Sequence, residues 1–284
     1  MKVKEIIKKS KLPNLETETL LAFILKKTRE YIIIHQEENL NLKDAQKFFS
    51  MEKKRALNLP LAYLTGNKEF YNLNFKVNKN VLVPRPETEI LIDTILTRLK
   101  TSKNNYDFLD IGTGSGIIII SLAHEIFKHN KTIFNNSSFL GVDISEPALK
   151  IAKQNAKTYN LNTKIAFFKS DLLKGLPTKA LKDSHLVIAA NLPYLTKKQL
   201  ENEPSIKHEP SLALDGGPKG LEYYHRLLKE LKKINFKSLF LILEINPEQA
   251  IAIKKVAQKT WSQATLKIIK DLRKQSRFLT ISLN

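Results

Sequence analysis

The chain has 284 residues, 42% of them hydrophobic, which is enough to bury a substantial core and allows one large domain with a smaller one. No apolar run approaches the roughly 20 residues that a membrane-spanning helix needs, and the amino terminus lacks the apolar block of a signal peptide, so we expect a cytoplasmic protein. The lack of cysteine excludes disulfides and cysteine nucleophiles, whereas the formal net charge of +19 suggests an acidic or polyanionic partner such as RNA or the ribosome. Because the lysines are scattered along the chain, as an AT-rich coding sequence would also produce, the charge alone selects no partner.

Residues 1–60 are predicted to form a small helical domain. Asn14 is expected to cap one helix and Asn41 to cap another that runs to Leu57, because apolar residues recur at helical spacing after each asparagine. The segment contains no combination of residues that would carry catalysis. We therefore interpret it as a substrate-docking domain.

Residues 61–84 are predicted to form a β-hairpin connector. Apolar and polar residues alternate on both sides of Tyr71 and Asn72, and Asn tolerates the left-handed conformation that a tight turn requires. The connector leads into a proline-rich motif and then a helix that ends near Leu99. The motif is Pro84-Arg85-Pro86-Glu87-Thr88-Glu89. Its prolines favour an extended chain, and its acidic residues suit the start of a helix.

Residues 85–284 are predicted to form a single α/β domain, because strand and helix patterns alternate from Asp107 onward. The strands are expected at 107–111, 138–142, 164–169, 185–190, 238–244, 265–270 and 276–282. The last two are joined too tightly for a helical crossover, so they are expected to be antiparallel. A seven-stranded Rossmann-like sheet that ends in an antiparallel hairpin resembles the class I methyltransferase fold. The polar stretches 128–137 and 179–184 are predicted to be loops.

A glycine-rich turn follows the first predicted strand. It consists of Gly112-Thr113-Gly114-Ser115-Gly116, and a helix is expected to begin at Ile117. Glycines let the backbone approach a ligand closely and turn sharply into a helix amino terminus. The spacing differs from the dinucleotide fingerprint, so a cofactor with a pyrophosphate group is the second choice for this site.

The next two strand ends carry carboxylates. Asp143 ends the second strand, where an acidic residue can accept hydrogen bonds from two ribose hydroxyls. Asp171 follows the third strand and can accept from an adenine amino group, with Leu172 as an apolar wall. Helix capping is the alternative role for each aspartate. Together with the glycine turn, these contacts predict S-adenosylmethionine as the cofactor, with Asn191 as a further contact.

The fourth strand runs directly into Asn191-Leu192-Pro193-Tyr194. Ligands of open α/β sheets bind beyond the carboxyl ends of the strands, so this polar stretch lies where a reaction centre is expected. An ordinary turn is the alternative, because Asn and Pro are common turn residues.

At this point the chain resembles the peptide chain release factor glutamine methyltransferases over nearly its whole length. The matching stretches are Pro60 to Gly66, Val81 to Glu89, Leu109 to Gly116, Gly141 to Ser145, Asn191 to Tyr194, Glu209-Pro210 with Ala213-Leu214 and Gly216-Gly217, Gly220-Leu221 and Leu243-Glu244-Ile245. Residues 84–87 are more specific to this family than the glycine turn, which many methyltransferases share.

The resemblance implies methyl transfer from S-adenosylmethionine to the side-chain amide nitrogen of a glutamine in the Gly-Gly-Gln motif of a release factor, leaving S-adenosylhomocysteine. It implies that the Asn191 side chain and the Leu192 carbonyl accept the two amide hydrogens, while Tyr194 packs beside the planar amide and Pro193 holds the turn. Leu192 departs from the family, which has proline there, and Asn-Leu-Pro-Tyr also resembles the motif of ribosomal RNA adenine dimethyltransferases.

Several alternatives remain open at the level of sequence. A methyltransferase of this kind could act on a glutamine of a ribosomal protein or on ribosomal RNA adenine, and a non-catalytic adaptor could use the basic surface to bind RNA or ribosomes. We expect a monomer that contacts release factors, with no membrane association. The six histidines show no metal-ligand spacing, so no metal is assigned.

Overall fold

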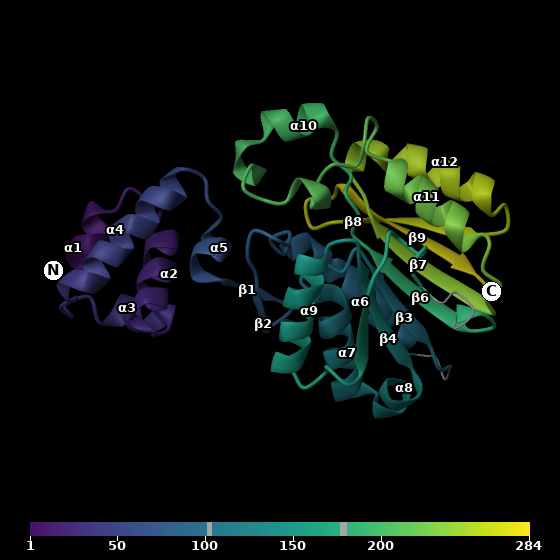
Figure 1. The fold of residues 1–284 in the computed structure, drawn as a ribbon, viewed down its shortest axis with the longest axis horizontal. Helices are drawn as coiled ribbons and strands as arrows, with labels where there is room; N and C mark the ends of the chain where they lie inside the picture. Colours follow the sequence, from purple (N-terminus) through teal and green to yellow (C-terminus); the bar gives the residue numbers. More distant parts are fainter. Residues whose placement is uncertain (101–103, 177–180) are drawn as a thin grey trace. The chain divides into compact units, whose positions relative to one another are not determined.

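The computed structural model describes residues 1–100, 104–176 and 181–284, and these fall into two compact units (Figure 1). We call residues 1–67 together with 203–208 the helical unit, and residues 68–202 together with 209–284 the sheet unit. Each unit has a hydrophobic core formed by its own residues.

The helical unit consists of short helices packed around buried residues such as Leu20, Leu21 and Phe48. The helices are α1 (Val3–Lys9), α2 (Asn14–Leu25), α3 (Arg29–Ile34), α4 (Leu42–Ala56) and α5 (Leu61–Thr65). The Asn41 side chain accepts a hydrogen bond from the backbone N–H of Asp44 at 2.8 Å, which confirms the predicted cap of α4. The cap predicted at Asn14 is wrong, because Asn14 is already the first residue of α2 and follows Pro13.

The predicted hairpin is formed by β1 (Asn67–Phe70) and β2 (Leu73–Lys76). Its two turn residues, Tyr71 and Asn72, have φ angles of 50° and 57°, as a type I′ turn requires. Phe70 and Phe75 are buried and meet edge to face, with ring centroids 6.3 Å apart. The hairpin therefore buries an aromatic pair while its turn exploits the tolerance of Asn for positive φ.

The large sheet has seven strands in the order β5-β4-β3-β6-β7-β9-β8. The strands are β3 (Asp107–Ile111), β4 (Ser138–Asp143), β5 (Ile165–Lys169), β6 (His185–Ala190), β7 (Ser238–Glu244), β8 (Thr265–Lys270) and β9 (Ser276–Leu283). All neighbouring pairs from β5 to β7 are parallel, whereas β9 is antiparallel to both β7 and β8. The predicted class I methyltransferase architecture is confirmed, including the terminal antiparallel hairpin.

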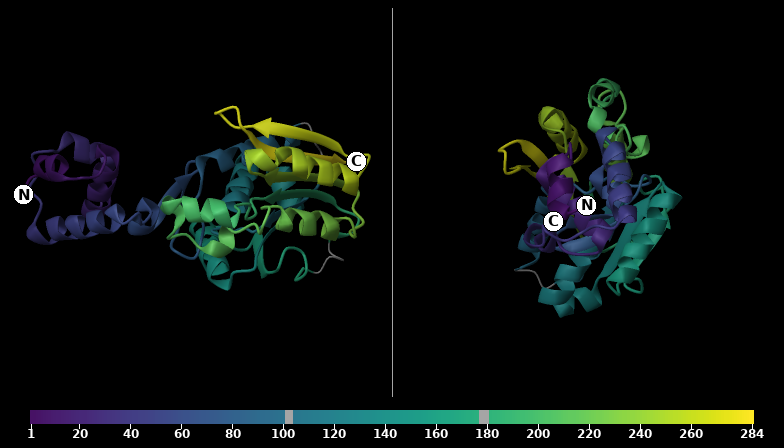
Figure 2. Two further views of the ribbon diagram at one scale, coloured as in Figure 1. Left: turned by 90° about the horizontal axis from the view of Figure 1, so that it is seen from above. Right: turned by 90° about the vertical axis from the view of Figure 1, so that its left-hand side faces the viewer.

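Helices cover both faces of this sheet (Figures 1 and 2). The covering helices are α6 (Glu89–Leu99), α7 (Ile117–His129), α8 (Lys131–Asn136), α9 (Glu146–Thr158), α11 (Glu222–Leu231) and α12 (Ala250–Thr260), whereas α10 (Lys197–Asn202) buries no residue. Short 3-10 turns are η1 (Pro86–Thr88), η3 (Pro204–Ile206), η4 (Ser211–Ala213) and η5 (Pro247–Gln249). Among the residues that the structure describes, no helix is both long and apolar enough to cross a bilayer.

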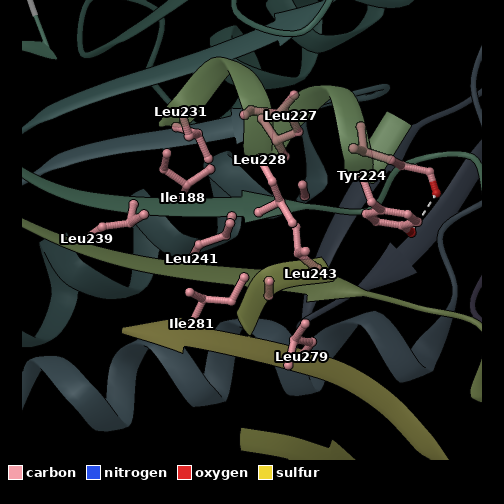
Figure 3. Packing of buried hydrophobic residues seen from close by; sticks show 14 of the residues in the cluster. Ile188, Tyr224, Leu227, Leu228, Leu231, Leu239, Leu241, Leu243, Leu279 and Ile281 are labelled. Atoms are coloured by element: carbon pink, nitrogen blue, oxygen red, sulfur yellow. Dashed lines mark hydrogen bonds between the residues drawn. The ribbon is translucent and has the colours of Figure 1, made fainter. Parts of the chain in front are cut away.

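Successive residues of each strand enter different cores, as the alternation of side chains along a strand requires. In β3, Phe108 faces α6 and α7, whereas Leu109 belongs to the cluster that includes α11 and α12. Figure 3 shows the cluster that contains Leu109, in which Leu227 and Leu228 of α11 lie over leucines and isoleucines of the sheet. These two layers hold the carboxyl ends of the parallel strands in fixed positions.

The loop predicted at 128–137 is wrong, because residues 131–136 form α8. The Asn130 side chain accepts a hydrogen bond from the N–H of Ile133, so the polar residue that suggested a loop is a helix cap. Ile133 is buried and Phe134 packs against Phe127 and Phe139, which gives the helix an apolar side. In the loop predicted at 179–184, residues 179 and 180 lie outside the described residues.

Candidate active site

A cavity lies at the carboxyl ends of β3, β4, β5 and β6, which is the usual ligand site of such sheets. It brings together most of the residues predicted to act: Gly112, Thr113, Gly114, Ser115, Asp143, Asp171, Leu172, Asn191, Leu192 and Pro193. Gly116 and Tyr194 lie outside this lining. Residues that are distant in sequence thus converge on a single cavity.

The glycine turn presents its backbone to the cavity. Gly112, Gly114 and Gly116 have φ angles of 75°, 55° and 82°, which L residues with side chains rarely adopt. A β-carbon at Gly114 would meet only the Gly112 carbonyl oxygen, at 4.0 Å, so Gly114 faces open space. A β-carbon at Gly116 would lie 2.8 Å from Ile120 and 3.2 Å from Ala152, so Gly116 lets α7 pack closely on α9.

Asp143 is tied to the glycine turn by hydrogen bonds. One carboxylate oxygen accepts from the N–H of Gly114 at 2.8 Å, and the other accepts from the N–H of Ser145 at 2.8 Å. Burial raises the pKa of Asp143 above its usual value. The Ser145 side chain caps α9, so capping is not the task of Asp143. Each carboxylate oxygen keeps capacity for a further donor.

Asp110 is a buried carboxyl group that the sequence reasoning missed. Its Oδ2 accepts from the Thr113 hydroxyl at 2.7 Å and from the N–H of Ile119 at 3.3 Å, whereas Oδ1 has no partner among the described residues. Burial raises the pKa of Asp110 to about 7. An acidic residue inside an otherwise apolar strand, just before a glycine turn, is the signal that could have identified it.

Asp171 lines the cavity and is held by a cation. Arg226 of α11 donates to both of its carboxylate oxygens, at 2.6 and 2.5 Å, and this bond lowers the pKa of Asp171. The neighbouring Leu172 is buried, with a positive φ of 53°. Tyr223, also on α11, lines the same cavity and was not predicted. The structure therefore adds α11 to the set of elements that shape this site.

Asn191 follows β6 and is partly exposed at the cavity. Its side-chain Nδ2 donates to the Thr88 hydroxyl oxygen at 3.4 Å. Leu192 is 3% exposed, and its side chain packs against the glycine turn, where a β-carbon at Gly112 would lie 3.2 Å from Leu192 Cδ2. The Tyr224 hydroxyl lies 3.2 Å from the Leu192 carbonyl oxygen and closer, 2.5 Å, to the Glu244 carbonyl oxygen.

Tyr194 is anchored by its backbone and buried at its hydroxyl. Its carbonyl oxygen accepts from the Gln249 side chain at 2.8 Å. A β-carbon at Gly216 would lie 2.7 Å from the Cα of Tyr194, so glycine allows this close approach. Burial raises the pKa of the Tyr194 hydroxyl to about 12.

The proline-rich motif, residues 84–89, makes contacts that capping could not explain. Arg85 pairs with the buried Glu209 at 2.5 Å, and Glu209 also accepts from the N–H of Val83 at 2.9 Å. The Thr88 hydroxyl donates to Glu244 at 2.7 Å. Glu89 accepts from the N–H of Tyr71 in the hairpin at 2.9 Å. The motif therefore connects the cavity wall to segments far away in the sequence.

Comparisons with known proteins agree with this architecture. Residues 102–282 match a family model described as a methyltransferase domain, and residues 2–66 match one described as the PrmC N-terminal domain. Human METTL16, solved as its catalytic domain with a MAT2A 3′UTR hairpin, has a TM-score of 0.55 at 14% identity over 93% of this chain and 92% of that chain. This likeness concerns the fold alone.

Curated relatives match nearly the whole chain. The release factor glutamine methyltransferase of Moorella thermoacetica is 35% identical over 93% of this chain and 89% of its own length. The protein of the same name from Bacillus anthracis is 32% identical over 92% and 90%. The chain belongs to the release factor glutamine methyltransferase family.

Proposed function

We propose that the protein transfers a methyl group from S-adenosylmethionine to the side-chain amide nitrogen of the glutamine in the Gly-Gly-Gln motif of a translation release factor. The observation that carries the proposal is the convergence of the glycine turn, Asp143 and the amide of Asn191 on one cavity. Relatives that are named for this activity match the chain over nearly its full length.

The cavity suits an adenosyl cofactor. Gly114 faces open space, so its backbone can approach a ligand. The Asp143 oxygens keep acceptor capacity for ribose hydroxyls. Asp110 Oδ1, which has no partner among the described residues, is a buried polar atom next to the glycine turn, and burial raises the pKa of this carboxyl to about 7. Asp171, Leu172 and Tyr223 would surround the adenine.

The chemistry at the substrate side depends on orientation. S-adenosylmethionine supplies an electrophilic methyl group on a sulfonium. An amide nitrogen is a poor nucleophile because its lone pair is delocalised, so both of its N–H bonds have to be directed away from the methyl. Asn191 would accept one hydrogen through Oδ1 and Leu192 the other through its backbone carbonyl, as fixed dipoles that need no strong base. One proton leaves the nitrogen for solvent after transfer.

Leu192 replaces the proline that the family has at this position, and its packing supports the same task. The side chain is buried against Gly112 in the wall of the cavity. The hydroxyl hydrogen of Tyr224 goes to the nearer Glu244 carbonyl, which leaves lone-pair capacity on the Leu192 carbonyl oxygen. The role of Tyr194 as an aromatic wall stays a prediction, because Tyr194 does not line the cavity.

The test incubates the purified protein with methyl-labelled S-adenosylmethionine and a purified release factor. We expect label on the Gly-Gly-Gln glutamine and none on a release factor in which that glutamine is replaced by alanine. Parallel reactions contain ribosomal RNA and large-subunit ribosomal proteins. Label on either of these, with none on the release factor, would contradict the proposal in favour of another substrate.

The proposal extends to the helical unit, which we assign the docking of the release factor in the cytoplasm, with the enzyme acting as a monomer. Large apolar side chains are exposed on this unit, including Ile34 and Leu42, each 75% exposed. We expect Ile34→Ser and Leu42→Ser to raise KM for the release factor several-fold without changing kcat or cofactor affinity. Equal KM values in both variants and the wild type, measured by initial rates, would argue against docking through these side chains.

A further inference from the structure

The side chain of Asn191 has two chemically opposite ends, and only its oxygen can accept a hydrogen from a substrate amide. Asn191 is partly exposed at the cavity, where the end that faces the substrate has to be fixed by a neighbour. That neighbour is Thr88, whose hydroxyl oxygen lies 3.4 Å from Asn191 Nδ2. Thr88 lines the same cavity but is fully buried, so we expect it to act on the substrate through Asn191.

The direction of this hydrogen bond is set one step further away. A threonine hydroxyl has a single hydrogen, and that of Thr88 goes to Glu244 Oε2 at 2.7 Å. Burial raises the pKa of Glu244 to about 7, so the carboxylate is ionised above that pH. It can then only accept, and the Thr88 oxygen is left with lone pairs alone. The NH₂ end of Asn191 is the end that matches these lone pairs, and its Oδ1 is therefore turned away from Thr88.

Glu244 is well placed to control both acceptors of the proposed reaction. Its carboxylate holds Thr88, and its backbone carbonyl accepts the Tyr224 hydroxyl beside the carbonyl of Leu192. Figure 3 shows Tyr224 at the end of the row of leucines that α11 packs on the sheet. Charged and titratable groups whose fields reach the Glu244 carboxylate are Arg277, Arg85, Glu87 and Tyr194.

We propose that Thr88 and Glu244 are positioning residues that fix the Asn191 amide with Oδ1 towards the substrate. This inference rests on the proposed function, since it concerns the orientation of the acceptor in that reaction. If the Glu244 carboxyl were protonated it could donate to Thr88, whose hydrogen would then be free for Asn191 Oδ1. The Asn191 side chain would then rotate and direct its NH₂ group, instead of Oδ1, at the N–H groups of the substrate amide.

The first test compares Thr88→Val with Thr88→Ser. Valine keeps the shape and removes the hydroxyl, so kcat should fall about 10- to 100-fold, the range for partners that orient functional ligands. KM for the release factor and Kd for S-adenosylmethionine should stay within about twofold, because Thr88 is fully buried. Serine keeps the hydroxyl and should restore kcat. An unchanged kcat in Thr88→Val, or a Thr88→Ser variant as slow as Thr88→Val, overturns the inference.

The second test is a double-mutant cycle with Asn191→Ala. If Thr88 acts through Asn191, Thr88→Val should cause no further loss of kcat once the amide is absent, whereas an independent structural effect would add. In the same way, Glu244→Gln should cause no further loss in the Thr88→Val background. Additive losses in either cycle contradict the proposed chain of contacts.

The two levels of the proposal fail in different ways. If the wild-type protein places no label on the release factor, the proposed function is wrong. If the wild type is active but the Thr88→Val loss is absent or additive, only the positioning role is wrong. If circular dichroism shows that Thr88→Val does not fold, Thr88→Ser and Glu244→Gln are compared instead. A wild-type kcat in Thr88→Ser with a lower kcat in Glu244→Gln supports the positioning role. Equal kcat values in the two variants contradict it.

Discussion

In the reaction that we propose, Asn191 is an uncharged acceptor, which has an advantage there over a charged base. The target nitrogen gains little from proton removal before methyl transfer, so fixed dipoles in the correct direction are what the protein can contribute. Asn191 follows a parallel strand, and its Nδ2 donates to the Thr88 hydroxyl. In our proposal this hydrogen bond limits the freedom that an exposed amide would otherwise have.

Asn191→Ala should therefore lower kcat by about 10²- to 10³-fold, the scale for removing one preorganised polar partner. The Kd for S-adenosylmethionine, measured by calorimetry, should change little, because Asp143 and the glycine turn remain. Turnover comparable with that of the wild type would show that Asn191 does not accept from the substrate.

Asp143→Ala should have the opposite signature. Loss of a charge-assisted acceptor should raise the Kd for S-adenosylmethionine about 10- to 100-fold, with a smaller change in kcat at saturating cofactor. Asp107→Ala is the matched control, because Asp107 lies at the amino end of β3, away from the cavity, and bonds the Ser138 side chain. A Kd that is unchanged in Asp143→Ala, or raised equally by both substitutions, would remove Asp143 from the site.

Residue patterns predicted the side chains that line the cavity better than they predicted the buried side chains that contact them. Asp143 and Asn191 stand at strand ends, where sequence position alone places a side chain near the ligand site. Thr88 and Glu244 are separated by 156 residues, and neither local propensity nor spacing indicates that they meet. Interactions of this kind arise from the tertiary fold, so only the structure could identify them.

At the scale of elements, the proline-rich motif, residues 84–89, connects the cavity wall to another segment of the sheet unit. It passes from an extended segment into α6 and is joined to the segment before η4 by the pair Arg85–Glu209. The Glu209 side chain is 2% exposed and satisfies both the guanidinium and the N–H of Val83. Breaking this pair would leave buried polar groups without partners.

Glu209→Ala should consequently lower the free energy of unfolding of the sheet unit by about 1–3 kcal/mol, the cost of leaving a buried donor unsatisfied. Lys174→Ala is the control, since its pair with Asp171 is 62% exposed at the lysine and should contribute less than about 1 kcal/mol. Urea titrations of both variants provide the comparison. Equal effects of the two substitutions would mean that the buried Arg85–Glu209 pair contributes no more to the free energy of unfolding than an exposed ion pair.

At the scale of the whole molecule, alternating strand and helix patterns were sufficient to predict where the strands lie along the chain, and the short last connection predicted the antiparallel end of the sheet. β3, β6, β7 and β8 have the bounds expected from the sequence, and β6 and β7 are nearly continuous apolar runs. α8 was missed because its apolar side has only a few residues within a polar stretch. The sheet also buries carboxyl groups, and these make its stability depend on pH.

Asp110 allows that dependence to be tested. Its pKa is raised from 3.8 to about 7 by burial, so the stability it confers is fully present below pH 4 and is lost as pH rises towards 7. Wild-type protein should therefore lose stability relative to Asp110→Asn between pH 4 and 7, with a slope approaching about 1.4 kcal/mol per pH unit, and the difference should level off above pH 7. Asparagine can still accept from Thr113 and Ile119 through its oxygen but does not titrate in this range. Urea unfolding at pH 5 and pH 8 measures the difference directly, and a difference that does not change with pH would show that Asp110 is ionised in the folded protein throughout.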